Sequence, residues 1–152
     1  MVRALQALVE SGKVGWLGLS NAAPLHWQSL GRELPLRCNQ IELSLLAQQS
    51  AWDGQLQTLQ ADGLQVLAWS PLAGGAFPPA LQQALAEVAG VLQATPNQVA
   101  LAWLRRLPGS PRPILGSLRW SRIEEALHGA TLQLDAPTWF YLAEAARGHK
   151  AP

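Results

Sequence analysis

The sequence predicts an α/β fold in which about four parallel strands are flanked by outer helices. Strand-like and helix-like segments alternate four times along the 152 residues, a pattern typical of parallel strands joined by right-handed crossovers. The strand segments are almost continuously apolar, as in sheets that are covered on both faces. They begin near residues 14, 37 and 64, a spacing typical of barrels. An open doubly wound sheet and a TIM barrel both fit, and both bind ligands at the carboxyl ends of their strands.

Three strand segments occupy the first half of the chain, and each is preceded by a helical segment. Apolar residues at helical spacing predict the first helix, and Gly12 and Gly63 are placed to end the first and third helices. Pro24 suits the first turn of the second helix. No G-x-G-x-x-G fingerprint is present, which argues against a classical Rossmann site. We expect helices over about 2–11, 24–34 and 52–61, and strands over 14–19, 37–44 and 64–69.

The second half of the chain contains strong signals for helix starts. Thr95 can act as an N-cap, with Pro96 in the first turn and Gln98 completing a capping box. Ser121 and Glu124 have the same spacing, so we expect a second capping box at the start of a later helix. After a loop rich in glycine and proline over 72–79, we expect helices over about 80–92, 96–107, 121–129 and 137–146, and a last strand over 113–117.

Composition narrows the class of protein. At 152 residues, the chain is expected to form one domain, 1–152. Charged residues make up only 14%, against about a quarter in ordinary soluble chains, which predicts extra buried or partner-covered area.

The net charge of +1 gives no electrostatic field that would attract nucleic acid or a membrane surface. No membrane span or signal peptide is expected. The single cysteine, Cys38, indicates a core residue in a reducing compartment, so the expected location is the cytoplasm.

The segment 111–127 combines features that suit a phosphate site. A short apolar strand precedes Gly116 and Ser117, which let the backbone approach a ligand closely. The N–H groups of the following helix start, the serine hydroxyl and the side chains of Arg119 and Arg122 would then converge on one anion. Taken alone, the same features also fit an ordinary strand-to-helix turn with two solvated arginines.

Polar or aromatic residues end the other three strands. Ser20 and Asn21 end the first strand, and both types are also common in turns and helix caps. Gln40 and Glu42 point to the same side of the second strand. They need partners because an unpaired buried polar group costs about 1–3 kcal/mol, so they fit either a ligand site or an internal hydrogen-bond network. Trp69 ends the third strand and can stack on a planar ligand or pack in the core.

Five blocks of the sequence resemble consecutive blocks of the aldo-keto reductase family, in the family's order. The blocks are Gly12–Asn21, Cys38–Leu46, Val66–Gly75, Thr95–Leu104 and Pro113–Leu127. The resemblance covers the C-terminal half of the family's barrel and is closest to bacterial NADP-dependent members. It implies half of a (β/α)8 TIM barrel, truncated at its N-terminal side. In such a half, the strands at 14–19 and 113–117 would be unpaired edges, which invite homo-oligomers.

The resemblance also implies an NADP(H) site and assigns roles at its nicotinamide end. On the family's pattern, Ser20, Asn21 and Gln40 would hold the nicotinamide carboxamide. Trp69 would take the aromatic position that stacks on the nicotinamide ring.

At the phosphate end, Ser70 and Leu72 would contact the pyrophosphate. Ser117 and Arg122 would hold the adenosine phosphate, and Glu125 would lie near the adenine. These three groups of contacts are implied by the resemblance, residue by residue.

Two positions depart from the family's pattern at this phosphate end. Gly116 stands where many members carry a cationic side chain, so a preference for NADPH over NADH depends mainly on Arg122, with Arg119 as its rival. Ala126 stands where many members carry asparagine, which weakens the expected adenine contact.

The larger departure is that the family's catalytic Asp, Tyr, Lys and His come from the other half of the barrel. No residue of these types in this chain matches one of the family's catalytic positions, so the resemblance assigns no catalytic residue. No metal site is expected. We interpret six residues of these types as surface residues: Lys13, His26, His128, Tyr141, His149 and Lys150.

The resemblance therefore implies the cofactor-binding half of an NADP(H)-dependent oxidoreductase of carbonyl or alcohol substrates. A small-molecule carbonyl substrate would bind once an N-terminal half completes the site. Two alternatives stay open, a non-catalytic nucleotide-binding or oligomerising half-barrel remnant and a fragment of an intact reductase. No partner that is a nucleic acid or a membrane is expected, and the residues do not identify the substrate.

Overall fold

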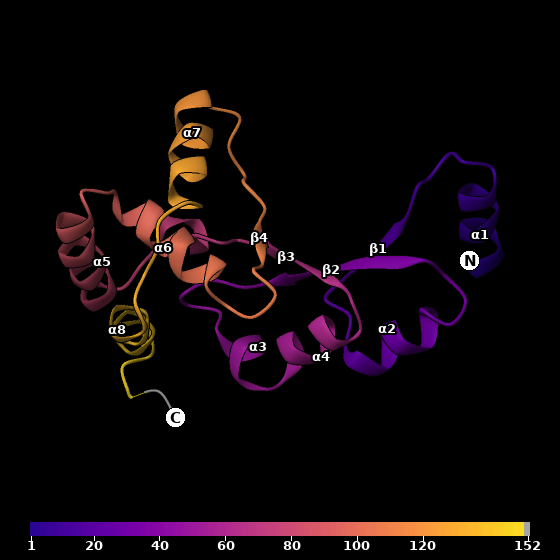
Figure 1. Cartoon of the computed structure of the whole chain (residues 1–152), viewed down its shortest axis with the longest axis horizontal. Helices are drawn as coiled ribbons and strands as arrows, with labels where there is room; N and C mark the ends of the chain where they lie inside the picture. The colour runs from indigo at the N-terminus through magenta and orange to yellow at the C-terminus, as the bar shows by residue number, and fades with distance from the viewer. Residues whose placement is uncertain (151–152) are drawn as a thin grey trace.

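Four parallel strands form one sheet in the order β1-β2-β3-β4, so each strand lies beside its neighbour in the sequence (Figure 1). The computed structural model describes residues 1–150. The strands are β1 (Leu17–Ser20), β2 (Leu36–Glu42), β3 (Gln65–Trp69) and β4 (Arg112–Pro113). The helices are α1 (Val2–Glu10), α2 (Pro24–Leu30), α3 (Gln49–Trp52), α4 (Gln55–Ala61), α5 (Pro79–Leu92), α6 (Pro96–Arg105), α7 (Trp120–Gly129) and α8 (Ala136–Arg147), with a 3-10 turn η1 (Ala73–Gly75). This order confirms the predicted parallel α/β fold.

The hydrophobic core lies against one face of the sheet. Ile41, Val66 and Ala68 point to this face and are buried. The opposite face carries Ser20 and Glu42, which are exposed. The prediction of a sheet covered on both faces is therefore wrong for residues 1–150. The near-continuous apolar character of the strands hides an alternation in which one face is more polar than the other.

Helix α6 runs through the centre of the core, where every residue from Val99 to Leu104 is buried. The indole rings of Trp103 and Trp139 stack, with centroids 5.2 Å apart and planes 3° from parallel. Each indole N–H donates to the backbone carbonyl of the other tryptophan, at 3.2 and 3.0 Å. The capping box of Thr95 and Gln98 is formed as predicted. Among the helices of residues 1–150, none has the length and apolar character needed to cross a membrane.

The helix predicted over 52–61 is two short helices. α3 ends at Trp52 and α4 begins at Gln55, and between them Gly54 has a φ of 88°. Glycine adopts this conformation without steric cost, so the chain turns sharply here.

All four strands are shorter than predicted, β2 and β3 by one residue and β1 and β4 by more. β1 begins at Leu17 rather than at residue 14, and β4 contains two residues instead of spanning 113–117. Pro113 has no N–H to continue the ladder. The N–H of Ile114 still donates to the carbonyl of Ala68 at 2.8 Å, after which the chain leaves the sheet.

Both outer strands, β1 and β4, are paired on one side only in the described part of the chain (Figure 1). The segment after β4 also exposes large apolar side chains, with Leu118 fully exposed and Trp120 exposed to 71%. Unpaired strand edges with apolar surroundings invite pairing with another chain. We propose that copies of this chain associate through these edges, and we expect a dimer or larger species by sedimentation at micromolar concentration.

A pair of lysine substitutions tests this association. Leu118→Lys adds a charge beside the β4 edge and should shift the sedimenting species towards monomer. Leu25→Lys places the same charge on α2, where the side chain is also highly exposed at 80%, and should leave the species unchanged. A monomeric parent chain, or equal effects of the two variants, would contradict the proposal.

Candidate functional site

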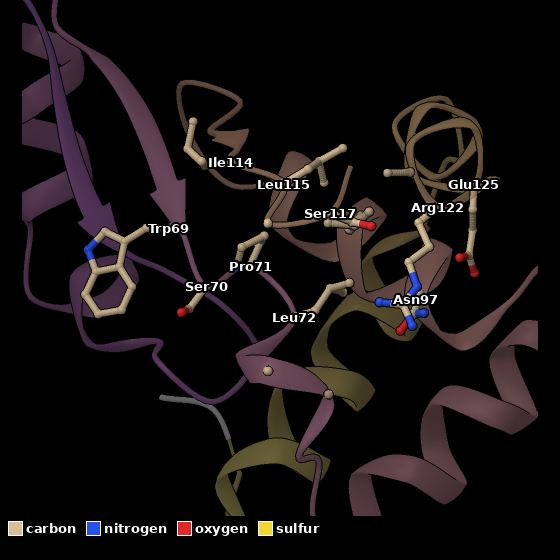
Figure 2. A pocket seen from close by; sticks show the side chains of 15 residues that line it. Trp69, Ser70, Pro71, Leu72, Asn97, Ile114, Leu115, Ser117, Arg122 and Glu125 are labelled. Carbon is tan, nitrogen blue, oxygen red and sulfur yellow. The ribbon is translucent and has the colours of Figure 1, made fainter. Parts of the chain in front are cut away.

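A cavity of about 590 Å³ opens at the carboxyl ends of β3 and β4 (Figure 2). Its walls come from three segments that are far apart in the sequence: the loop after β3, the first two turns of α6, and the stretch from β4 into α7. The lining includes six predicted site residues, which are Trp69, Ser70, Leu72, Ser117, Arg122 and Glu125. The fold therefore brings together the two parts of the predicted site that follow β3 and β4.

Helix α7 carries Arg122 into the cavity from its first turn. The helix begins one residue earlier than predicted, with Arg119 at the N-cap position and no side-chain cap. The predicted capping box is therefore wrong, because Ser121 and Glu124 lie within the helix. Instead, the backbone N–H of Arg119 donates to Ser117 Oγ at 3.2 Å. This bond leaves the Ser117 hydroxyl proton available to a ligand.

The guanidinium of Arg122 has no hydrogen bond or ion pair with any residue of the described chain. Its head lies towards Asn97 at the start of α6 (Figure 2). The carboxylate of Glu125 is held by α6, since Thr95 Oγ1 donates to Glu125 Oε1 at 2.5 Å. Gln98 Nε2 also donates to the Glu125 carbonyl at 3.2 Å. The positive charge of Arg122 in the cavity is therefore not paired by Glu125, whose carboxylate is bound to Thr95.

Close packing fixes α7 against α6. A Cβ on Gly129 would lie 2.8 Å from the Cα of Gln98, so only glycine allows this approach.

Gly116, on the cavity wall, has free space around it, because a Cβ there would meet nothing within 4 Å. A larger side chain would therefore fit at position 116. Arg119, the rival of Arg122, is exposed and does not line the cavity.

At the other end of the cavity, Trp69 connects β3 to the end of β1. Its indole Nε1 donates to Asn21 Oδ1 at 3.0 Å, and the Asn21 N–H donates to the Gln40 carbonyl at 2.8 Å. Asn21 and Ser70 adopt positive φ values of 51° and 49°, which asparagine tolerates better than most residues. Ser20 is exposed and pairs in register with the half-buried Gln40. The three residues predicted for the carboxamide lie together beside Trp69, outside the cavity lining.

Nine of the fifteen lining residues are not predicted site residues, and among these Asn97 and Leu101 come from a helix to which the sequence assigned no site residue. Both lie on α6, one turn apart. The predicted helix start at Thr95 could have indicated that the first turns of this helix belong to a phosphate site, because a helix N-terminus favours anions. Nothing in the local sequence, however, places α6 beside α7.

Residues of catalytic type lie away from this cavity. Tyr141 is 44% exposed on α8, and its hydroxyl donates to Glu87 Oε2 at 2.7 Å. This hydrogen bond, with partial burial, raises the pKa of Tyr141. The other candidates are exposed, as predicted: Lys13, His26, His128, His149 and Lys150. Within residues 1–150, no three His, Cys, Asp or Glu residues form a group that could hold a metal ion.

Comparison with known proteins agrees with the predicted family. The model of the aldo/keto reductase family matches residues 1–147. Oxidoreductase YdhF of Escherichia coli (strain K12) is 39% identical over 98% of this chain and 53% of its own length. The 6-dehydroglucose reductase of Agrobacterium fabrum is 38% identical over 96% of this chain and 51% of its own length.

Among solved structures, the thermostable aldo-keto reductase Tm1743, crystallised with the inhibitor epalrestat, shares the fold. Its TM-score is 0.84 at 24% identity, over 95% of this chain and 53% of that one. The chain thus spans about half the length of the relatives it matches. The fold likeness confirms that its four parallel strands correspond to part of a TIM barrel.

Proposed function

Because the chain belongs to the aldo/keto reductase family, we propose that it is the cofactor-binding part of an NADP(H)-dependent oxidoreductase of carbonyl or alcohol substrates. The observation that carries this proposal is the cavity with Arg122 at one end and Trp69 at the other. Ser70 and Leu72 line the wall near Trp69 and would contact the pyrophosphate. NADP(H) would supply or accept a hydride, and the residues of this chain would bind and orient it.

Arg122 supports binding of the 2′-phosphate. Its guanidinium has no partner in the described chain, and the planar fork of donors matches phosphate oxygens. The Ser117 hydroxyl and the uncapped first turn of α7 add donors at the same end. Glu125 does not compete for Arg122, because Thr95 holds its carboxylate.

Trp69 and Asn21 support binding of the nicotinamide. The half-buried indole of Trp69 offers an aromatic surface for stacking. Asn21 Oδ1 already accepts from Trp69, so its Nδ2 can donate to the carboxamide carbonyl. Ser20 and Gln40 lie on the adjoining strand ends and offer further polar contacts.

Reduction of a carbonyl also requires an acid that protonates the oxygen. Within residues 1–150, we find no such acid in the cavity lining, where Glu125 is the only carboxylate and is bound by Thr95. We therefore propose that the acid comes from a second barrel half. The same observation favours a second candidate function, a nucleotide-binding half-barrel without catalysis of its own.

Cys38 supports a cytoplasmic location for the protein. It is a free, buried thiol, and burial raises its pKa. A buried neutral thiol is inert and persists where disulfides do not form.

The chain alone should therefore catalyse no NADPH-dependent reduction of aldehydes or ketones. The assay follows the loss of NADPH absorbance. Tyr141→Phe should change neither this result nor NADPH binding, because the Tyr141 hydroxyl is bonded to Glu87 outside the cavity. Turnover by the pure chain that Tyr141→Phe abolishes would show that Tyr141 is catalytic.

The cofactor site itself is tested by titration with NADPH and NADH. Tighter binding of NADPH supports the proposal, and equal binding contradicts it.

A further inference from the structure

Another cavity, of about 250 Å³, lies near the amino end of β4, at the end of the sheet opposite to the proposed cofactor site. Helices α6 and α7 both end at it, and its other walls are Ser110, which precedes β4, and residues 132–134, which precede α8. Its charged lining residues are Arg105 and Arg106, and in the described chain no Asp or Glu lines it. Sites for drug-sized ligands begin at about 300 Å³, so this volume suits a small ion.

The side chain of Arg105 has hydrogen-bonding capacity that the described chain does not use. Its Nη1 donates to the Ser110 carbonyl at 3.2 Å, and Ser110 Oγ donates to the Arg105 carbonyl at 3.1 Å. These two bonds hold the half-buried side chain at the cavity. The Nε of Arg105, however, is buried and has no hydrogen-bond partner in residues 1–150. Buried N–H groups are rarely left unpaired, and a bound ion or water is one explanation where they are.

Arg106 brings a second positive charge to the cavity. Its Nη1 donates to the Leu134 carbonyl, and the other N–H groups of the guanidinium remain for a ligand. Asp135 follows Leu134 but does not line the cavity. Hydrogen bonds from Thr138 and the charge of Arg106 lower the pKa of Asp135, so Arg106 shares part of its charge with this carboxylate. Arg105 forms no ion pair within the described chain and keeps its full charge.

The charges around this cavity select an anion. Each helix C-terminus carries about half a negative charge, and two helices, α6 and α7, end here. The two full positive charges of Arg105 and Arg106 exceed this, and no carboxylate of the described chain lines the cavity to offset them. The planar donor pairs of guanidinium groups match the oxygens of phosphate and sulfate. No aromatic ring of residues 1–150 lines the cavity, so a flat ligand such as a nucleotide base gains no stacking.

We propose that this cavity binds a small tetrahedral oxyanion, phosphate or sulfate, between Arg105 and Arg106. The anion accepts hydrogen bonds from the unpaired N–H groups of both guanidiniums and ties the end of α6 to the segment before α8. Helix α6 connects this cavity to the proposed cofactor site, since it carries Asn97 in that site and Arg105 in this one. A bound anion therefore stabilises the helix that forms one wall of the cofactor site, whether or not a cofactor is bound.

The test uses the full chain and measures binding of inorganic phosphate and, separately, of sulfate by calorimetry, at an ionic strength held constant with chloride. Because Arg122 also attracts phosphate, both titrations are repeated with Arg122→Ala, which should keep a bound anion. Gln133→Glu places a carboxylate at an exposed position of the lining and should weaken binding by at least about tenfold through charge repulsion. Gln57→Glu makes the same change at an exposed position of α4 and is the matched control.

Two further variants remove the arginine charges directly. Arg105→Gln should abolish anion binding, provided that circular dichroism shows the variant to be folded. If Arg105→Gln does not fold, Arg106→Gln, at an exposed position, should weaken binding by about tenfold, because a charge-assisted hydrogen bond is lost.

Binding of either anion that depends on these lining residues and survives in Arg122→Ala supports the proposal. The inference is overturned if the unchanged chain binds neither anion, if Arg122→Ala removes all binding, or if Gln57→Glu weakens binding as much as Gln133→Glu. It is also overturned if folded Arg105→Gln binds as tightly as the unchanged chain. The two arginines would then only hold the helix ends, through the carbonyls of Ser110 and Leu134.

Discussion

The Arg122→Ala variant should lose most of the preference for NADPH over NADH while its affinity for NADH barely changes. The 2′-phosphate is nearly dianionic, whereas NADH carries a neutral hydroxyl at the same position. Arg122 is the one cationic residue in the cavity lining of the described chain, and a charge-assisted contact contributes about 1.5–3 kcal/mol. The variant should therefore bind NADPH about tenfold to a hundredfold more weakly. Titration of tryptophan fluorescence with each cofactor measures both affinities.

Arg119→Ala is the matched control, because Arg119 lies three residues earlier and outside the cavity lining. Its preference for NADPH should survive, and higher salt should weaken NADPH binding more than NADH binding. Gly116→Lys should act in the opposite direction and tighten NADPH binding, since a Cβ at position 116 meets nothing within 4 Å. A preference for NADPH that survives in Arg122→Ala and vanishes in Arg119→Ala would show that Arg119, and not Arg122, binds the 2′-phosphate.

Helix starts show which elements the sequence can predict. The capping box at Thr95 is formed because Gln98 lies three residues further on and both partners belong to one turn. Ser121 and Glu124 have the same spacing, yet α7 begins before them. The position of α7 is set by its packing on α6, where Gly129 lies against Gln98. A local pattern cannot report that contact.

The candidate site shows the same limit. The residue types at the strand ends, such as Asn21 and Trp69, could be identified because parallel strands end at one edge. Their hydrogen bond joins residues 48 positions apart and depends on the register of the strands. The bond from Thr95 to Glu125 spans 30 positions, and it ties the Glu125 carboxylate to the start of α6 while Glu125 still lines the cavity. The contact of Glu125 with adenine stays a prediction. Long-range partners of this kind decide which charges face a ligand.

The Trp103→Ala variant should lose about 3–5 kcal/mol of unfolding free energy. Trp103 is completely buried, and its ring stacks on Trp139 at a centroid distance of 5.2 Å. Alanine would leave a large void, and it would also leave the buried carbonyl of Trp139 without the indole donor that lies 3.2 Å away. Because small domains have total stabilities of about 5–15 kcal/mol, this is a large fraction of the total. Urea denaturation followed by far-ultraviolet circular dichroism measures it.

Two further variants separate packing from hydrogen bonding in this effect. Trp103→Phe keeps an aromatic ring but removes the N–H, so it should cost less than Trp103→Ala, with about 0.5–1.5 kcal/mol from the lost indole hydrogen bond. Trp120→Ala removes a tryptophan that is 71% exposed on α7 and should change stability by at most about 0.5 kcal/mol. If Trp103→Ala and Trp120→Ala cost the same, the paired tryptophans do not hold α8 against α6. If Trp103→Phe costs as much as Trp103→Ala, the hydrogen bond rather than the ring contact joins these two helices.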